Sequence, residues 1–593
     1  MAASESELLA RVSHQLSNIY RDLYTQDEIS ALAAQLISEM LQSDRVRSPT
    51  PHKNRWDESD VVLICYGDSV NKTDCDTPHT VAIEPPLVTL KHFLDEYTEG
   101  VINSVHILPF YPYSSDEGFA VMNYVQVNEA LGTWQHVNDI AKDYRLMADL
   151  VINHCSSKSR WFDNFVKGID PGRGYFKTAA PQSDLSQVVR PRTSPLLQKV
   201  QSAQGEQHLW CTFSHDQIDF DFANAQVLIE FVRIIRFYLE NGVRLFRLDA
   251  VAFLWKEIGT NCINLAQTHE MVRLLRTLIE HVEPSAVIIT ETNIPNEQNL
   301  AYFGNANEAH CVYNFSLPPL LLHTLSTGDC TALKKWMMRM PPAQNGTAYF
   351  NFIASHDGIG LRPVEGLLSE SQINALVACM QRFGAKVSLR SNNDGSVSPY
   401  EINIALIDAM QGTEHGPDQH TVARFLCAHA IMFALEGIPG LYIHSLVGTQ
   451  NDVERFNNTQ HNRAINRHRW HLDDLQSKLE NENTQHGKVH RGMLNLLRIR
   501  TQQAAFHPNA TQFTLHLGEQ IFGFWRQSAD RQQSIFCLYN ISNHVQTLGL
   551  GDLNLVNMQP WQDLISGEVY TDMEHIVQLQ PYQAMWLTNV GSG

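Results

Sequence analysis

Apolar residues recur every three or four positions over residues 5–43, in two runs that predict two helices separated by a turn. Thr25 and Glu28 have the spacing of a capping box, which places the start of the second helix just after Thr25. We therefore expect an N-terminal helical extension over residues 1–50. Such an extension either packs against the body of the protein or offers a surface to a partner, and we favour packing.

From about residue 60 to 445, short runs rich in β-branched and apolar residues alternate with amphipathic helical stretches. Eight of these runs are predicted strands, at residues 61–65, 105–109, 146–153, 243–251, 286–290, 312–315, 349–354 and 440–444. Eight strands separated by helices predict an α/β fold, a parallel (β/α)8 TIM barrel, within residues 51–510. The uneven spacing of the runs predicts inserted subdomains near residues 155–220 and 360–420.

The pattern changes after about residue 510. Phe513, Leu515 and Leu517 alternate with polar residues, as do parts of residues 521–525 and 535–539. Alternation with a period of two is typical of strands that have one buried face. We therefore expect a small antiparallel β domain over residues 511–593.

Composition and charge exclude several classes of protein. Hydrophobic residues make up 43% of the chain, which suits a large core, and the apolar stretch at residues 425–435 is too short to span a bilayer. The formal charge of −19 argues against a broad nucleic-acid or anionic-membrane surface, which needs clustered Lys and Arg. The start MAASESELLA lacks the features of a secretory signal, and the cysteines show no paired spacing, so we expect a cytoplasmic protein.

Three carboxylates stand at or near the ends of predicted strands: Asp249 in FRLDAV, Glu291 in VIITETN and Asp357 in FIASHDG. In a β/α barrel the C-terminal ends of the strands converge on one mouth. An unpaired acid at the end of a buried run is unfavourable unless it faces water or a partner. One such acid is readily explained as a helix cap, but three on separate strands favour a shared site.

These three segments, together with DLVINHCS, resemble the four catalytic regions of the α-amylase superfamily, glycoside hydrolase family 13, in their order and spacing. The resemblance implies a retaining glycosyl transfer in which Asp249 is the nucleophile and Glu291 the general acid/base. It also implies that Asp357 stabilises the transition state. Arg247 precedes Asp249 by two residues and would help to keep it ionised.

Longer segments are similar to the sucrose phosphorylase subgroup of this superfamily. They include HILPFYPYSSDEGFAVMNY, RPRTSPLL, SHDGIGLRP and AINRHRW, and the similarity covers roughly residues 60–470. It implies a pocket that is closed behind a single glucose. The residues that the resemblance assigns to binding this glucose are Asp116, Phe119, His154, Arg247, His356 and Arg467.

The same subgroup implies a phosphate site made by Arg192 and Tyr400, since the planar donor fork of a guanidinium suits an oxygen anion. Two features depart from typical sucrose phosphorylases. Glu401 stands where they carry Gln, and Arg362 lies close to the expected rim of the pocket. Together with the N-terminal helices, these features resemble glucosylglycerate phosphorylases, in which an extra arginine would suit the carboxylate of glycerate.

We therefore expect a phosphorylase that transfers glucose from a small α-glucoside to inorganic phosphate. Glucosylglycerate is the favoured glucoside, and sucrose, sucrose 6-phosphate and glucosylglycerol are the alternatives. A hydrolase or transglucosidase with the same three acids is a rival interpretation. A non-catalytic relative, like the amino-acid-transporter heavy chains, is another, but it needs a membrane span that the sequence lacks.

The sequence contains no HExxH motif and no clustered Cys and His ligands, so we predict neither a metal site nor an organic cofactor. We also predict no nucleic-acid and no membrane partner. The oligomeric state stays open.

Overall fold

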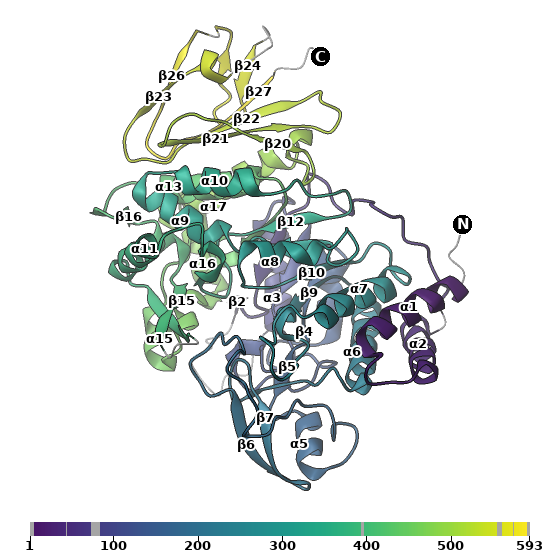
Figure 1. Cartoon of the computed structure of the whole chain (residues 1–593). Helices are drawn as coiled ribbons and strands as arrows, with labels where there is room; N and C mark the ends of the chain where they lie inside the picture. Colours follow the sequence, from purple (N-terminus) through teal and green to yellow (C-terminus); the bar gives the residue numbers. More distant parts are fainter. Residues whose placement is uncertain are drawn as a thin grey trace.

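Eight parallel strands close into a barrel at the centre of the structure, a computed structural model (Figure 1). It describes residues 5–42, 44–72, 84–392, 396–553, 560–572 and 574–589. The barrel strands follow chain order, and the last pairs again with the first: β1 (Val62–Cys65), β3 (Ser104–Ile107), β4 (Arg145–Val151), β9 (Val243–Asp249), β10 (Val287–Thr290), β11 (Cys311–Tyr313), β12 (Ala348–Asn351) and β18 (Ile438–Tyr442). Each overlaps one of the eight predicted runs, so the predicted fold class is confirmed.

The barrel strands are mostly apolar because helices cover them from outside while their other face fills the interior. Every residue of β1, β10 and β12 is buried. Helices that stand between successive barrel strands in the chain are α3 (Pro86–Tyr97), α4 (Trp134–Ala141), α6 (Ala225–Glu240), α7 (Ala266–Glu280), α8 (Asn296–Leu300), α9 (Leu317–Thr327) and α13 (Thr421–Ala434).

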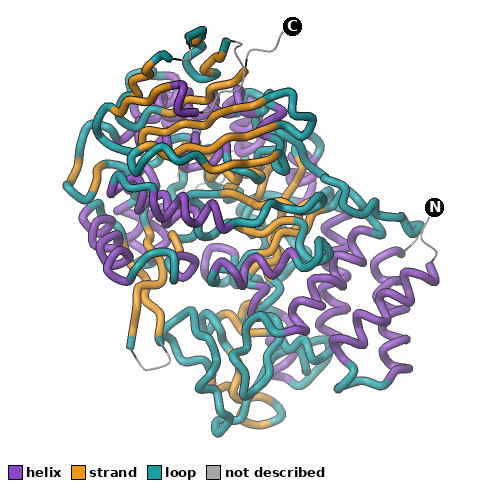
Figure 2. Tube along the Cα trace, turned by 45° about the horizontal axis from the view of Figure 1, so that its top comes forward, coloured by secondary structure: helices purple, strands orange, loops and turns teal. Residues whose placement is uncertain are grey.

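The N-terminal extension is a hairpin of two helices, α1 (Glu5–Tyr20) and α2 (Gln26–Leu41), and Figure 2 shows it beside other helices. The capping box of Thr25 and Glu28 is present at the start of α2. Helix α1 packs against α7, and α2 packs against α6. The buried face of α1 includes Val12 and Leu16, and the hydroxyl of Tyr20 donates a hydrogen bond to the carbonyl of Phe222 at 2.8 Å. The hairpin is therefore docked on the helical layer of the barrel.

Two excursions from the barrel supply parts of its mouth. Between β4 and β9 lie β5 (His154–Ser156), α5 (Arg160–Lys167), β6 (Leu197–Ser202), β7 (Gly205–Trp210) and β8 (Gln217–Asp219). Between β12 and β18 lie β13 (Ile359–Gly360), the short helix η4 (Arg362–Val364), α11 (Glu370–Arg382), β14 (Lys386–Ser391) and β15 (Val397–Asn403). Strands β13, β15 and β14 form a small antiparallel sheet that brings residues 400 and 401 toward the mouth of the barrel.

The C-terminal part forms an antiparallel sheet in the order β20 (Thr511–Thr514), β21 (Ile521–Gln527), β22 (Ser534–Asn540), β27 (Ala584–Asn589), β24 (Trp561–Asp563) and β25 (Val569–Tyr570). Strand β22 packs against α13, where the Tyr539 hydroxyl donates to the carbonyl of Ala430. Figure 1 shows this sheet at the top of the molecule, where it packs on the outside of the barrel domain.

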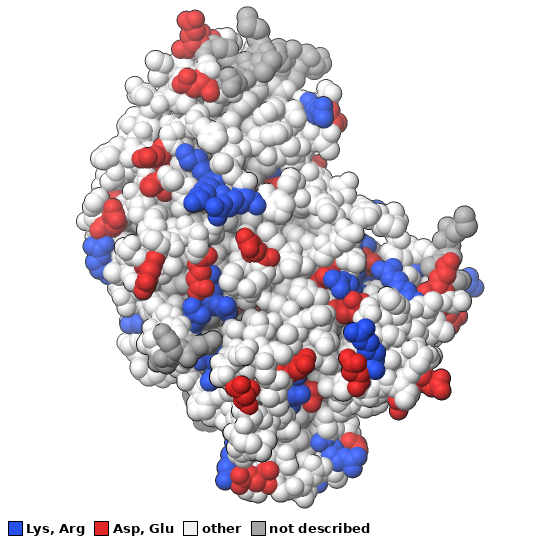
Figure 3. Space-filling view, in the orientation of Figure 1, with Lys and Arg blue, Asp and Glu red and all other residues white. Residues whose placement is uncertain are grey.

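Acidic and basic side chains are interspersed on the face drawn in Figure 3. None of the helices in the described part of the chain has both the length and the apolarity that a membrane crossing requires.

Candidate active site

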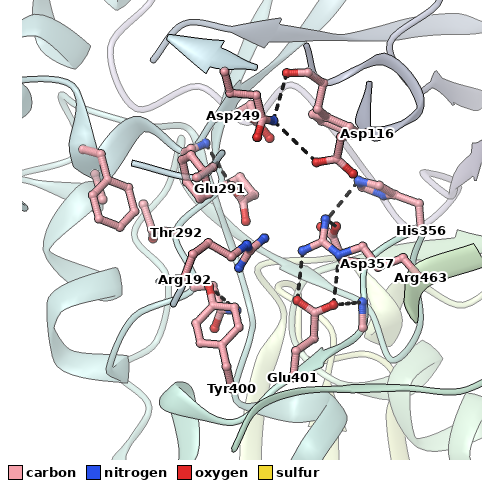
Figure 4. Close-up of a pocket in the computed structure, with 18 of the residues that line it drawn as sticks. Asp116, Arg192, Asp249, Glu291, Thr292, His356, Asp357, Tyr400, Glu401 and Arg463 are labelled. Carbon is pink, nitrogen blue, oxygen red and sulfur yellow. Dashed lines mark hydrogen bonds and ion pairs between the residues drawn. The ribbon is translucent and has the colours of Figure 1, made fainter. Parts of the chain in front are cut away.

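The three acids meet at one pocket at the mouth of the barrel (Figure 4). Asp249 is the last residue of β9, Glu291 follows β10 directly, and Asp357 lies in the loop after β12. The other predicted site residues that line this pocket are Asp116, Phe119, His154, Arg192, His356, Tyr400 and Glu401. Arg247, Arg362 and Arg467 are not among the lining residues.

Arg247 lies beneath the acids as a buried cation. Its guanidinium donates to Asp249 at 2.8 Å and makes a shorter contact with Asp149. Its second amino group is 3.9 Å from both Glu291 and Asp357. Although burial works to lower the pKa of Arg247, the surrounding carboxylates raise it well above its ordinary value, so this group stays charged.

Burial raises the pKa of Asp249 and the pKa of Glu291, and the neighbouring carboxylates raise both further. Arg247 acts in the opposite direction on each. Glu291 also accepts the backbone N–H of Ala250 at 2.9 Å, and Ala250 has a left-handed conformation with φ of 52° that aims this N–H at it. Because each negative charge disfavours the next, the two acids together retain a proton more strongly than separate carboxyl groups do.

Asp357 has the opposite balance. Burial alone would raise its pKa, but the guanidinium groups of Arg463 and Arg247 bring it below the ordinary value. The pocket therefore combines one carboxyl group whose pKa is lowered with two whose pKa values are raised.

The two predicted sugar-binding histidines are buried and neutral. Burial lowers the pKa of His154 and, more strongly, that of His356. His154 Nε2 lies 3.0 Å from the carbonyl oxygen of Phe119, and the Phe119 ring stacks on the ring of His356 at 4.9 Å. Neither ring nitrogen of His356 makes a hydrogen bond within the described part of the chain, although Nε2 lies 3.4 Å from a carboxylate oxygen of Asp357.

We expected both Asp116 and Arg467 to bind the sugar, but only Asp116 lines the pocket. The guanidinium of Arg467 lies 3.8 Å from Asp116 and 3.5 Å from Glu117. The Nε of Arg467 also donates to the carbonyl of His356 at 2.8 Å. Arg467 thus contacts the residues that form the pocket wall.

Arg463 lines the pocket, and sequence reasoning missed it. One amino group lies 2.5 Å from Asp357, and the other edge of the guanidinium donates to both oxygens of Glu401 at 2.9 Å (Figure 4). Glu401 also accepts the N–H of Gly358 at 3.0 Å. A Cβ on Gly358 would stand 2.4 Å from Cγ of Glu401, so this approach requires glycine. The available signal was the spacing of Arg463, four residues before Arg467 on the short helix Asn462–Asn466.

Two more lining residues, Phe213 and Gln217, come from the excursion between β4 and β9. Neither belongs to a sequence motif that we recognised. Gln217 donates to the carbonyl of Phe119 at 3.2 Å and so ties the excursion to the glucose side of the predicted site. Their presence could not be read from the sequence, because it depends on how the excursion folds back over the mouth.

Arg192 stands between two aromatic rings on the outer side of the pocket. Its guanidinium carbon lies 5.6 Å from the ring centre of Phe213 and 5.3 Å from that of Tyr400. The hydroxyl of Tyr400 accepts from the amide of Asn293 at 3.4 Å. Arg362 is close to Tyr400, on η4, but the pocket lining does not include it. The predicted acceptor arginine is thus near a lining residue without being one itself.

The arrangement suits displacement at a carbon atom by carboxylate chemistry. Asp249, which is paired with Arg247, and a second acid, Glu291, face one cavity, as retaining glycosyl transfer requires. Within the described residues, no group of three or more His, Cys, Asp and Glu side chains has an arrangement that could hold a metal ion.

Similarity to known proteins extends over nearly the whole chain. Residues 96–367 match the family described as alpha amylase, catalytic domain. The chain is 39% identical to the glucosylglycerate phosphorylase of Spirochaeta thermophila, over 98% of this chain and 99% of that protein. It is 38% identical to the glucosylglycerate phosphorylase of Escherichia coli, over 97% of this chain and 99% of that protein.

Likeness to a solved structure agrees with these sequence matches. The crystal structure of sucrose 6F-phosphate phosphorylase from Thermoanaerobacter thermosaccharolyticum superposes with a TM-score of 0.69 and 25% identity. The superposition covers 83% of this chain and 95% of that one.

Proposed function

Since the chain belongs to the glucosylglycerate phosphorylase family of the α-amylase superfamily, we propose that it transfers glucose from glucosylglycerate to inorganic phosphate. The products are α-D-glucose 1-phosphate and glycerate. The observation that carries the proposal is the meeting of Asp249, Glu291 and Asp357 in one pocket that also contains Arg192. The acids supply glycosyl transfer, and the guanidinium supplies the anion site that phosphorolysis needs beside the reacting carbon.

In the first half of the reaction, a carboxylate oxygen of Asp249 attacks the anomeric carbon while the bond from that carbon to the glycerate oxygen breaks. Glu291 gives its proton to the departing oxygen. We assign the shared proton to Glu291 because Arg247 is 2.8 Å from Asp249 and 3.9 Å from Glu291. The charge is therefore better stabilised on Asp249, which becomes the glucosyl ester.

In the second half, an oxygen of phosphate attacks the same carbon and the bond to Asp249 breaks. Glu291, now ionised, accepts the proton of the attacking P–OH group and returns to its starting state. The two displacements each invert the anomeric centre, so the α-configuration is retained. Arg192 and Tyr400 bind the phosphate in this step.

The glucose unit lies among Asp116, Phe119, His154, His356 and Asp357. An ionised Asp357 binds the sugar hydroxyls more tightly as the ring acquires oxocarbenium character, so it favours the transition state over the ground state. Arg463 and Arg247 support this role by holding Asp357 ionised. Arg467 does not contact the sugar; it fixes Asp116 and the backbone of His356, which do line the pocket.

The test is phosphate release from α-D-glucose 1-phosphate with a panel of acceptors: glycerate, glycerol, fructose, fructose 6-phosphate and water. We expect the largest rate with glycerate. The Asp249→Asn variant serves as the inactive control. A preference for glycerol or a fructose would replace the acceptor and keep the mechanism. Equal release with water and with every acceptor would identify a hydrolase instead.

A further inference from the structure

Two arginines line the pocket among the described residues, and their surroundings differ sharply. Every nitrogen of the Arg463 guanidinium is engaged: one by Asp357 and the other two by Glu401. Its charge is thereby balanced by two carboxylates. An incoming anion would have to displace one of them, so Arg463 is a poor site for a ligand anion.

Arg192 has no such balance. Its one hydrogen bond goes from the Nη1 to the carbonyl oxygen of Pro191 at 3.1 Å, and the described residues give it no ion pair. The rings of Phe213 and Tyr400 hold its guanidinium in place by their faces, which leaves most of its N–H groups without an acceptor.

The electrostatics of the pocket make such a cation necessary for any anionic acceptor. Five carboxyl groups line the pocket, those of Asp116, Asp249, Glu291, Asp357 and Glu401. Phosphate or a carboxylate entering this field is repelled unless a cation faces it. Within the described part of the chain, Arg192 is the lining cation that makes no ion pair, and its charge acts on Asp357 and Glu401 only from a distance.

Both acceptors must also come to the same place. Under the proposed function, the glucosyl ester on Asp249 is attacked by phosphate in one direction and by glycerate in the other, and both deliver a proton to Glu291. Glycerate is so small that its carboxylate stays within one or two carbon atoms of whichever hydroxyl attacks. The anionic parts of the two acceptors therefore occupy nearly the same volume.

We infer that Arg192 is a single anion site used alternately by phosphate and by the carboxylate of glycerate, an inference that rests on the proposed function. Selectivity for a carboxylate-bearing acceptor then comes from the same guanidinium that makes the enzyme a phosphorylase. On this inference Arg362, which does not line the pocket, is not required for binding the carboxylate.

The experiment must separate acceptor binding from donor binding, because glucose 1-phosphate and glucosylglycerate both carry the anions in question. α-Glucosyl fluoride transfers its glucose to Asp249 and releases fluoride. Its leaving group therefore carries neither a phosphate nor a carboxylate. Product ratios are then measured with phosphate, glycerate and uncharged glycerol present together. Glycerol serves as an internal reference, so the ratios do not depend on the rate of loading.

In the Arg192→Ala variant, we expect the yields of glucose 1-phosphate and of glucosylglycerate, each relative to glucosylglycerol, to fall together by about 10- to 100-fold, the effect of losing a charge-assisted contact. Arg192→Lys keeps the charge without the fork and should lower both ratios by a smaller, similar factor. Arg173→Ala is the matched control: it removes an exposed arginine of the same excursion, paired with Asp170 and not lining the pocket, and both ratios should stay within about twofold of the wild type.

A loss confined to glucose 1-phosphate in the Arg192 variants would overturn the inference, because glycerate would then have a separate cation. A loss of the glycerate ratio in Arg362→Ala would identify that cation. Failure of the proposed function looks different: the wild-type enzyme itself would form neither glucose 1-phosphate nor glucosylglycerate from the fluoride.

Discussion

The guanidinium of Arg463 stands 2.5 Å from a carboxylate oxygen of Asp357. Its opposite edge is held by both oxygens of Glu401, so the arginine cannot turn away from Asp357 without breaking a bidentate ion pair. All three groups are buried or nearly so, where such contacts are strong because water does not screen them. Glu401 thereby fixes the position of Asp357 without touching it.

Glu401→Gln keeps the size of the side chain and removes the charge that holds Arg463. We expect kcat for phosphorolysis to fall by roughly 10-fold, because Asp357 is less firmly placed, while KM for glucosylglycerate changes much less. Steady-state kinetics measure this split. Glu365→Gln is the control, since it removes a carboxylate that pairs with Arg390 outside the pocket. Equal effects of the two substitutions would contradict a positioning role for Glu401.

Asp249→Asn should abolish turnover, with a loss of at least about 10⁴-fold in kcat, because an amide cannot form the glucosyl ester. The variant should unfold at the same temperature as the wild type or higher, since it removes one negative charge from a crowded group. Activity assays and thermal unfolding give the two results. Asp473→Asn, at an exposed position on the helix Leu472–Glu480, is the matched control and should leave both unchanged. Appreciable activity of Asp249→Asn would refute the assignment of the nucleophile.

The raised pKa of Glu291 predicts an alkaline limit to catalysis. Burial raises this pKa, and Asp357 raises it further, so Glu291 keeps its proton at a higher pH than an ordinary glutamate does. As the pH rises through that pKa the proton is lost, and the departing glycerate oxygen can no longer be protonated. We expect kcat/KM for glucosylglycerate to fall on this side of the profile.

α-Glucosyl fluoride provides the comparison for this limit, because fluoride leaves without needing a proton. The alkaline fall should be absent from kcat/KM for the fluoride and present for glucosylglycerate. If both substrates show the same fall, then a group other than Glu291 is responsible.

Leu16→Ala tests the docking of the N-terminal hairpin. Leu16 is fully buried on α1, whereas Leu9 on the same helix is 38% exposed. We expect Leu16→Ala to cost about 2–5 kcal/mol of stability, and Leu9→Ala to stay within about 0.5 kcal/mol of the wild type. Thermal unfolding midpoints of the two variants measure the difference. Equal midpoints would mean that α1 does not pack against the barrel as described.

The barrel was predictable because its strands are continuous apolar runs, and a run that is buried on both faces leaves a strong local signal. The three acids were predictable for the same reason, since each follows such a run. Whether an arginine faces the pocket carries no comparable signal. Arg362 and Arg463 both stand near a recognisable motif, yet Arg463 lines the pocket and Arg362 does not.

The contacts that decide this join distant parts of the chain. Arg463 meets Asp357 and Glu401 only after β15 has paired with β13 and brought Glu401 beside Gly358. Nothing in the sequence pairs Glu401, which lines the pocket, with Arg463. The sequence likewise did not indicate how the N-terminal helices dock, because docking depends on the faces of α6 and α7 against which they pack.

The order of these elements along the chain has a consequence for synthesis. Helices α1 and α2 leave the ribosome first, but α6 begins about 180 residues later, so at ordinary translation rates the hairpin waits for roughly 10 to 40 s before its partner helices emerge. Throughout that interval the face of α2 that packs against α6 is uncovered, and the face of α1 that packs against α7 stays uncovered longer still, because α7 begins only at Ala266. The nascent chain is therefore most exposed to premature association, and has the greatest need of a chaperone, while the first half of the barrel is being made.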